Sequence, residues 1–285
     1  MTEPMMSLAG KRVVVIGGTS GIGFAVALLA RELGAALVIA SSKASSVGSA
    51  LERLPGATGD VVDLKDEAST TGFLGRLDPF DHLAITAGEF DRRVFTSTED
   101  LDLALAREAF EVRFWGALAI IKHARHIIAP NGSVTLTSGM LAHRPSKGSP
   151  LPTAVVGAVE HLVCGLAVDL APLRINAVCP GLTLTELITN RPGSAGRIET
   201  ATAGLPLPRA ASPAEAAAAY IYLMLNGYLT GQILPVGKAW TSSWTRSCRS
   251  FSAAAFSGAN MKGTDLEPLG SAHPRDRSAR HGRLM

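Results

Sequence analysis

Tyrosine, cysteine and charged residues are all scarce in this chain of 285 residues, and each shortage is informative. The three cysteines, Cys164, Cys179 and Cys248, are too few and too scattered for a disulfide framework or a zinc cluster. Charged residues make up 18% and hydrophobic residues 47%, which excludes a disordered or polyelectrolyte chain. No apolar run approaches the roughly 18 residues of a membrane span, and the start, with Glu3 and Pro4, does not resemble a secretory signal. We therefore expect a cytoplasmic protein without a membrane partner.

The basic residues are concentrated at the end of the chain. Residues 238–285 hold eight lysines and arginines against three acidic residues, a net charge of +5, whereas residues 1–237 carry −2. The positive charge therefore gives no reason to expect nucleic-acid binding by the main part of the chain. The segment 238–285 is rich in Ser, Arg and Gly and lacks periodicity, which predicts an irregular or disordered extension, with an ordered helix as the alternative. An altered reading frame would also explain so abrupt a change.

Short apolar runs alternate with segments of helical periodicity over residues 8–237, which predicts a single α/β domain. Such alternation is typical of a parallel sheet covered by helices on both faces, a Rossmann-like, doubly wound fold in three layers. The predicted helices lie near residues 24–34, 66–77, 99–129, 153–171 and 213–226, and the long one near 99–129 is expected in two pieces. The seven predicted strands lie at or near residues 12–16, 36–40, 57–62, 82–86, 133–137, 174–178 and 232–236.

A glycine-rich turn joins the first predicted strand to its helix. Gly17, Gly21 and Gly23 follow the spacing G-x-x-x-G-x-G, with Ser20 directly before Gly21 and Ile22 directly after it. Such a turn lets backbone amides approach a pyrophosphate at the start of a helix. A tight turn without a ligand is the alternative, but the position within a strand–helix–strand unit favours a dinucleotide.

The second predicted strand ends in Ser41, Ser42 and Lys43, without a carboxylate. Enzymes that prefer NAD usually place Asp or Glu there to bind the ribose 2′-hydroxyl. Hydroxyl groups and a lysine would instead bind a 2′-phosphate. The sequence therefore favours NADP(H) as cofactor, with a solvated Lys43 as the alternative.

These motifs resemble those of the short-chain dehydrogenase/reductase family over residues 8–237. The turn GGTSGIG is similar to the family's TGxxxGIG, Thr86-Ala87-Gly88 to its Asn-Ala-Gly, and residues 174–181 (RINAVCPG) to its IRVNAVxPG. The resemblance also implies a dimer or tetramer, unless the segment after Val236 is foreign. The cofactor-binding residues expected from the turn, the second strand and this resemblance are Gly17, Thr19, Ser20, Gly21, Ile22, Gly23, Ser41, Ser42, Lys43, Asp63, Leu64, Ala87, Gly88, Pro180, Gly181, Leu182, Thr183 and Thr185.

The catalytic part of the family pattern is missing. Members of the family use a Tyr and a Lys in YxxxK as a proton relay, and here the aligned positions are Pro152 and Val156. No small shift in register restores the pair, because the first tyrosine of the chain is Tyr220. The family's helix Asn is replaced by Arg113, and Ser138 matches the family's catalytic Ser. We therefore expect Ser138 and Arg113 as catalytic residues, with a strand-end serine and a solvated arginine as the alternatives.

Other polar groups near this region are expected to have structural roles. His143, Arg144 and Lys147 are expected to be solvated, and Trp115 to pack within its helix. We expect Glu160, His161 and Asp169 on the exposed or interface side of one helix, so that no metal site is predicted.

Loss of the Tyr/Lys proton relay limits the reactions that the protein could catalyse efficiently. General acid assistance is worth about 10²- to 10⁴-fold in rate, so ordinary ketone reduction should suffer. We expect an NADP(H)-dependent oxidoreductase that reduces a small imine, iminium ion or activated double bond. The degenerate pattern resembles an atypical biosynthetic branch of the family, which includes NADPH-dependent iminium reductases of the malbrancheamide type. The alternatives are a cofactor-bound cyclase or Diels-Alderase, a non-catalytic NADP(H) sensor or interaction protein, and carbonyl reduction rescued by Ser138 and water.

Overall fold

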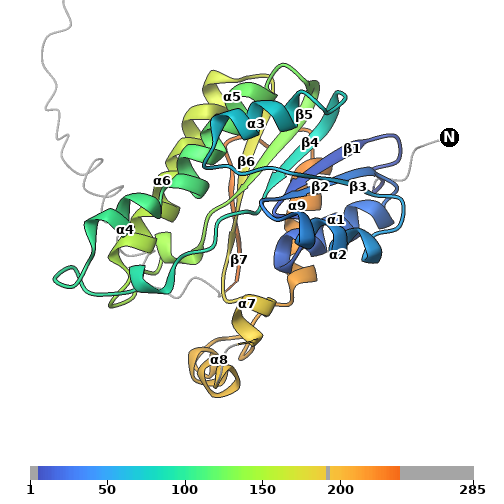
Figure 1. The fold of residues 1–285 in the computed structure, drawn as a ribbon. Helices are drawn as coiled ribbons and strands as arrows, with labels where there is room; N and C mark the ends of the chain where they lie inside the picture. Colours follow the sequence, from blue (N-terminus) through green and yellow to red (C-terminus); the bar gives the residue numbers. More distant parts are fainter. Residues whose placement is uncertain (1–5, 191–192, 238–285) are drawn as a thin grey trace, which may run out of the picture. The chain divides into compact units, whose positions relative to one another are not determined.

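Seven strands pair in parallel in the order β3-β2-β1-β4-β5-β6-β7 (Figure 1). The computed structural model describes residues 6–190 and 193–237, all within the first of the two units into which the chain divides, Met1–Ala239. The prediction of a doubly wound α/β sheet is therefore confirmed. The strands are β1 (Arg12–Ile16), β2 (Ala36–Ser41), β3 (Thr58–Val61), β4 (Phe80–Ile85), β5 (Ile128–Thr137), β6 (Arg174–Pro180) and β7 (Ile233–Val236).

Helices connect the strands and cover both faces of the sheet (Figure 1). The short helical segments are η1 (Arg92–Val94) and η3 (Met140–Ala142), both 3₁₀, and the π-helical η2 (Glu111–Gly116). The α-helices are α1 (Gly21–Glu32), α2 (Ala44–Arg53), α3 (Glu67–Leu74), α4 (Leu103–Glu108), α5 (Ala117–Ala124), α6 (Pro150–Asp169), α7 (Glu186–Thr189), α8 (Ser194–Thr202) and α9 (Pro213–Leu225).

The core lies in two layers, one on each face of the sheet. Along β1, Val14 and Ile16 pack with α3, α5 and α6, whereas Val13 and Val15 pack with α1, α2 and α9. This alternation follows from the two-residue period of a strand. Because both faces are covered, the central strands are apolar at nearly every position, which is why they are recognisable in the sequence.

The strands order the loops of the candidate site at one edge of the sheet. Ile16 at the end of β1 is paired with Ala40 on β2 and with Ile85 on β4. Ile85 is paired in turn with Leu136 on β5, so the ends of these four strands lie level with one another. The chain order reverses between β1 and β4, where crossover helices leave toward opposite faces. Ligands of such folds bind in the crevice beyond the carboxyl ends of these strands.

Several helical regions differ from the sequence predictions. The helix predicted in two pieces near 99–129 forms α4 and α5, and the π-helical η2 between them, which carries Arg113, was not predicted. Helix α2 was not predicted, because its residues, ASSVGSALER, include three serines and a glycine and few large apolar side chains. The short helices α7 and α8 follow no apolar periodicity and were also missed.

Helix α6 corrects the expectation that no apolar segment approaches the length of a membrane span. The helix has 20 residues and is apolar enough by composition, since an 18-residue window within it has a mean hydropathy of 1.7. One face of α6 packs on the sheet, through Val159 and Val163 among others, and it buries Glu160. We read it as a helix that covers the sheet. The predicted irregular extension, residues 238–285, lies outside the described residues.

Candidate cofactor and active site

The glycine turn after β1 packs tightly against the segment that follows β4. Gly17 has a φ of +86°, and a Cβ there would lie 2.6 Å from the Ala87 backbone nitrogen. A Cβ on Gly23 would overlap the Gly17 carbonyl oxygen and the Thr86 hydroxyl. Thr86 in turn donates its hydroxyl to the Ile16 carbonyl at 3.0 Å. Both glycines are therefore required for the chain to fold back closely at this edge.

Helix α1 begins at this turn without a local cap. In the described structure, the Ser20 side chain makes no capping hydrogen bond, and the first turn of α1 has no acidic residue. The first backbone amides of a helix have no intrahelical partner, and the helix dipole is positive there. The Gly21 amide instead donates to the Glu186 carboxylate at 3.0 Å. The start of α1 thus has the chemistry of an anion site.

Helix α2 begins in a similar way beside it, after β2. Lys43 is the N-cap residue, and over the described residues its side chain makes no capping bond and the first turn contains no acidic residue. Ser42 and Lys43 are exposed and Ser41 is partly exposed. Two neighbouring strands therefore lead into two helix starts that offer amides, hydroxyl groups and one lysine, as the NADP(H) prediction requires.

Asp63 and Leu64, two of the expected cofactor-binding residues, lie just after β3. The Asp63 carboxylate accepts a hydrogen bond from the Lys65 amide at 3.0 Å, and the Ser69 hydroxyl lies 3.0 Å from the Asp63 amide. Leu64 is buried, and a Cβ on Gly116 would lie 2.6 Å from its carbonyl oxygen. The segment is well fixed, and its contact with a nucleotide stays a prediction.

The segment after β6 closes over the glycine turn. The Gly181 amide donates to the Val236 carbonyl at 2.7 Å, and the Thr183 hydroxyl donates to the Gly181 carbonyl at 3.2 Å. The Thr185 side chain lies so close to Gly21 that a Cβ there would be 3.1 Å from its methyl group. Pro180, Gly181 and Leu182 are partly buried between these contacts. The structure thus brings the two ends of the predicted cofactor site together.

Arg113 is not the solvated arginine that was left open as an alternative. Its guanidinium lies over the Phe90 ring, 4.7 Å from the centroid, and Nη1 donates to the Thr137 carbonyl at 3.4 Å. Nε is shielded from solvent and has no hydrogen-bond partner among the described residues. Burial lowers the pKa of Arg113 to about 10, so the side chain remains charged at neutral pH. The side chain packs directly on Gly88, whose φ is +117°.

Ser138 lies in a buried polar cluster. Its hydroxyl donates to Glu160 Oε1 at 2.8 Å, and His143 Nε2 lies 3.0 Å from the same oxygen. The nearby Cys179 thiol has its pKa raised to about 12 by burial. One possible metal-ligand atom from each of His143, Glu160 and Cys179 lies within 4.8 Å of the other two.

This cluster corrects two predictions. Glu160 was expected on the exposed or interface side of its helix, but it is 7% exposed, because the loop after β5 and the end of β6 both cover it. His143 was expected to be solvated and instead pairs with Glu160. His161 and Asp169 are exposed, as predicted. The Ser138 hydroxyl donates its proton to a hydrogen bond with Glu160. A direct contact between Ser138 and a substrate therefore stays a prediction.

The positions of the missing relay are filled by apolar side chains. Pro152 and Val156 are buried on α6, and Val156 lies 3.3 Å from the place of a Cβ on Gly139. Tyr220 does not replace the relay, because its hydroxyl is hydrogen-bonded to Thr137 and the side chain is fully buried. Burial raises the pKa of Tyr220, which keeps the hydroxyl protonated.

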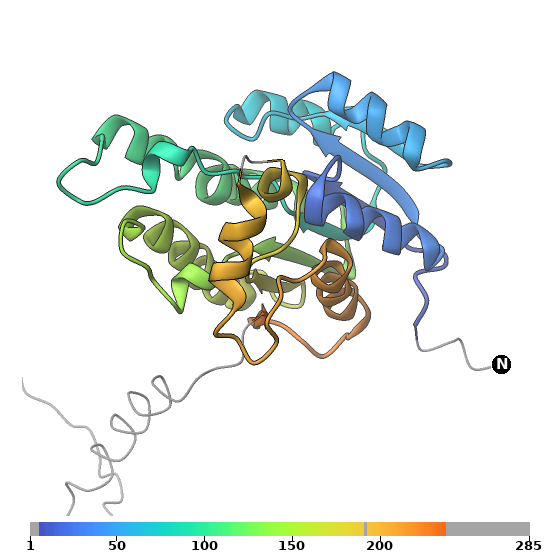
Figure 2. The same cartoon turned by 90° about the horizontal axis from the view of Figure 1, so that it is seen from below.

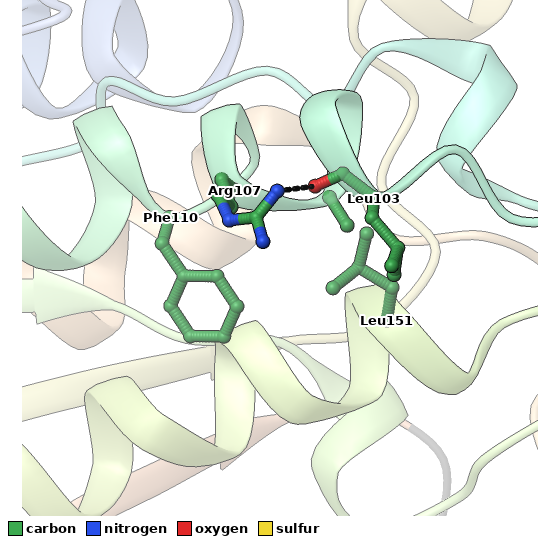
Figure 3. A pocket seen from close by; sticks show the side chains of 5 residues that line it. Leu103, Arg107, Phe110 and Leu151 are labelled. Atoms are coloured by element: carbon green, nitrogen blue, oxygen red, sulfur yellow. Dashed lines mark hydrogen bonds between the residues drawn. The ribbon is translucent and has the colours of Figure 1, made fainter.

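An apolar groove between α4 and α6 was missed by the sequence analysis (Figure 3). Its volume is about 230 Å³, below the roughly 300–1,000 Å³ of typical small-molecule sites. Leu103 is 64% exposed there, and Arg107 donates to the Leu103 carbonyl at 3.2 Å. The apolar spacing of Leu103 and Phe110 is a signal that could have indicated it. The groove is lined by Leu103, Ala106, Arg107, Phe110 and Leu151.

Comparison with known proteins agrees with this geometry. A family model described as enoyl-(acyl carrier protein) reductase matches residues 17–239. The chain is 34% identical over 247 residues to the short-chain dehydrogenase/reductase malC of Malbranchea aurantiaca, covering 80% of this chain and 93% of the relative. It is 36% identical over 259 residues to the short-chain dehydrogenase/reductase ucsE of Acremonium sp, covering 81% and 95%.

Solved structures show the same fold. The structure of the MalC reductase/Diels-Alderase from Malbranchea aurantiaca superposes with a TM-score of 0.76 at 32% identity, covering 82% of this chain and 98% of that one. A small-chain dehydrogenase in complex with NADPH gives a TM-score of 0.69 at 31% identity, covering 79% and 96%. The sheet, the glycine turn and these matches over most of the chain agree. The chain therefore belongs to the short-chain dehydrogenase/reductase family.

Proposed function

We propose that the protein is an NADP(H)-dependent reductase of an imine, an iminium ion or an activated double bond. The observation that carries this proposal is the pair of helix starts after β1 and β2, which lack local side-chain caps and first-turn acids. A dinucleotide with a 2′-phosphate brings anions to both places. The NADPH complex of a relative with a similar fold supports the choice of cofactor.

The residues present fit such a nucleotide. The turn at Gly17 and Gly23 has no room for a Cβ, so it stays compact and leads directly into the start of α1, where a phosphate could approach the first helix amides. Lys43 and the hydroxyl groups of Ser41 and Ser42 would hold the 2′-phosphate. Ala87, Gly88 and the segment 180–185 would line the rest of the nucleotide, since they border the same turn.

The chemistry of the pocket favours a substrate that needs little proton transfer. When bound, NADPH supplies a hydride, and its addition to an iminium carbon gives a neutral amine without a proton donor. Pro152 and Val156 provide neither a proton nor a charge, and Tyr220 is turned into the core. The remaining task of the chain is to hold the two reactants in near-attack geometry.

Arg113 is the group we propose to orient the substrate. Its Nε is shielded from solvent, and the side chain borders Gly88 just after β4, next to the proposed nucleotide. In such surroundings a guanidinium binds a carbonyl or anionic group strongly. Ser138 would act from behind the pocket, by holding Glu160 and, through it, His143 on the loop after β5.

A template role in cyclisation is the second candidate function. It is favoured by one specific observation, the similarity to a protein described as a reductase/Diels-Alderase. Both functions use the same nucleotide-filled pocket, but only the reductase consumes NADPH. A cytoplasmic location, expected from the sequence, and a homo-oligomer, expected from the family resemblance, accompany this proposal.

A titration with NADPH and NADH, followed by a test of hydride loss, examines the proposal. We expect NADPH to bind at least about tenfold more tightly than NADH, and Lys43→Ala to remove most of that difference. Lys65→Ala, which changes a lysine after β3, is the matched control. NADPH oxidation should then be faster with preformed cyclic iminium ions than with the corresponding ketones. If neither nucleotide binds, or if ketones react faster, the proposal is wrong.

A further inference from the structure

Glu186 contacts the start of α1 from a distant part of the chain. It is the first residue of α7, and its carboxylate oxygen Oε2 accepts a hydrogen bond from the Gly21 amide at 3.0 Å. Seen from below in Figure 2, the segment with α7, in yellow, lies beside the start of α1, in dark blue. The sequence analysis placed Gly21 and Thr185 in the cofactor site but gave no role to Glu186.

The position of this carboxylate is that of an anion on a helix start. The first intrahelical bond at this end runs from the Phe24 amide to the Ser20 carbonyl, so the preceding amides point outward. Within the described chain, neither the Ser20 side chain nor an acid in the first turn caps them. Glu186 supplies the negative charge that the helix sequence itself does not, and the side chain of Thr185 packs beside it on Gly21.

We propose that Glu186 competes with the cofactor pyrophosphate for the start of α1 and thereby sets nucleotide affinity. This inference rests on the proposed function, because it requires that a dinucleotide binds at the glycine turn. The carboxylate and a phosphate oxygen need the same amide, and their negative charges repel each other at close range. Binding therefore includes the release of Glu186 from Gly21, which weakens the measured affinity.

The pyrophosphate is common to both nicotinamide nucleotides, so the inference predicts the same effect on the binding of each. Loss of the Glu186 charge should tighten NADPH and NADH by the same factor and leave their ratio unchanged. Loss of Lys43 should change the ratio, because only NADPH carries the 2′-phosphate. The two residues thus have separable signatures in one pair of titrations.

Glu186→Gln isolates the charge, because glutamine keeps an oxygen that can accept the Gly21 hydrogen bond. The matched control is Glu199→Gln, the same change at an exposed position on α8. We expect Glu186→Gln to lower both dissociation constants about two- to tenfold, as expected for a charge at a helix start. The melting temperature without nucleotide should fall slightly in the same variant, since the α1 dipole loses its anion.

The outcomes separate this inference from the proposed function. Equal tightening of both nucleotides in Glu186→Gln but not in Glu199→Gln supports it. Unchanged affinities, or a change for NADPH alone, overturn it while leaving the reductase proposal intact. If no form of the protein binds either nucleotide, both proposals are wrong.

Discussion

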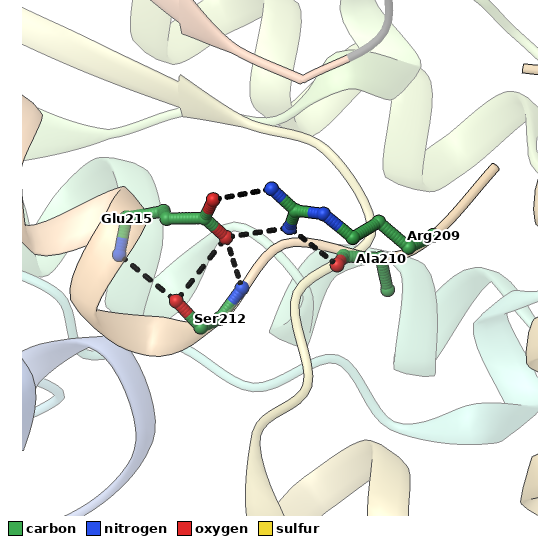
Figure 4. Close-up of polar contacts among 4 residues, drawn as sticks. All are labelled: Arg209, Ala210, Ser212 and Glu215. Carbon is green, nitrogen blue, oxygen red and sulfur yellow. Dashed lines mark hydrogen bonds and ion pairs between the residues drawn. The ribbon is translucent and has the colours of Figure 1, made fainter. Parts of the chain in front are cut away.

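Helices α1 and α9 pack together on the same face of the sheet but begin in opposite ways. The start of α9 is closed by its own sequence (Figure 4): the Ser212 hydroxyl accepts from the Glu215 amide, and the Glu215 carboxylate accepts from the Ser212 amide. Arg209 adds an ion pair of 2.6 Å to Glu215. The start of α1 has glycines where α9 has a capping box, and its anion comes from Glu186, 165 residues away.

The difference between the two helix starts predicts that one contributes to stability and the other to ligand binding. A local capping box satisfies two of the first amides with the helix's own side chains, which leaves fewer amides for a ligand. A helix start without a local cap keeps these amides exchangeable, at the expense of intrinsic stability. We therefore expect substitutions at α9 to change stability without changing nucleotide affinity. At α1 the reverse should hold, except where a glycine is required by packing.

The largest effect should come from Gly23→Ala. A Cβ there would overlap the Gly17 carbonyl and the Thr86 hydroxyl, both of which belong to tightly packed backbone turns. Overpacking of this kind typically costs about 1–3 kcal/mol, and the turn would also lose its shape for nucleotide binding. Thermal denaturation and NADPH titration of the purified variant measure both losses.

Gly48→Ala on α2 is the control for this comparison. A Cβ at Gly48 would meet no atom within 4 Å, and alanine has the higher helix propensity. We expect this variant to be as stable as the parent or more stable by about 0.5–1 kcal/mol. Equal stability losses in both variants would show that close packing at Gly23 is not the cause.

The next largest effect is a contrast between the N-cap serines of α1 and α9. Ser212→Ala removes an observed capping bond and should lower the free energy of unfolding by about 1 kcal/mol, with NADPH affinity unchanged. Ser20→Ala removes no capping bond, so stability should hardly change while NADPH affinity falls. Urea denaturation and nucleotide titration of both variants test the contrast. A stability loss in Ser20→Ala as large as that in Ser212→Ala would show that α1 is capped after all.

The fold was easier to predict than the site, for physical reasons visible in particular residues. A continuous apolar composition predicts buried strands such as Val13–Ile16, and the glycines predict the turn at Gly17. The S-x-x-E spacing of Ser212 and Glu215 is likewise a local signal. Features that depend on residues close in sequence were therefore readable in advance.

The missed features depend on contacts between distant segments. Glu160 lies on a helix whose apolar residues suggested one buried face, but Ser138 and His143 from another loop cover it. The hydrogen bond between Glu186 and Gly21 has no local signature at all. A division of the 99–129 helix was predicted, but the π-helical form of the segment at that division was not, because its apolar spacing differs little from that of an α-helix.

The smallest expected effect concerns the pH dependence of the α9 start. The hydrogen bond from Arg209 lowers the pKa of Glu215 from 4.5 to about 2, with the Ser212 amide contributing. A carboxylate with a lowered pKa in the folded state stabilises the fold above its unfolded pKa, and this stabilisation is lost as the pH falls. Glu215 should therefore contribute fully above about pH 4.5 and lose its contribution between about pH 4.5 and 2.

Glu215→Gln should reduce this part of the acid sensitivity. Because the neutral side chain does not titrate, the difference in unfolding free energy between parent and variant should shrink as the solution is acidified toward about pH 3. Urea denaturation followed by circular dichroism at several pH values gives this difference, with Glu199→Gln as the control. A difference that is independent of pH would mean that Arg209 and Glu215 are not paired in solution. The α9 start would then depend on the Ser212 hydroxyl alone, and its contrast with the start of α1 would be correspondingly weaker.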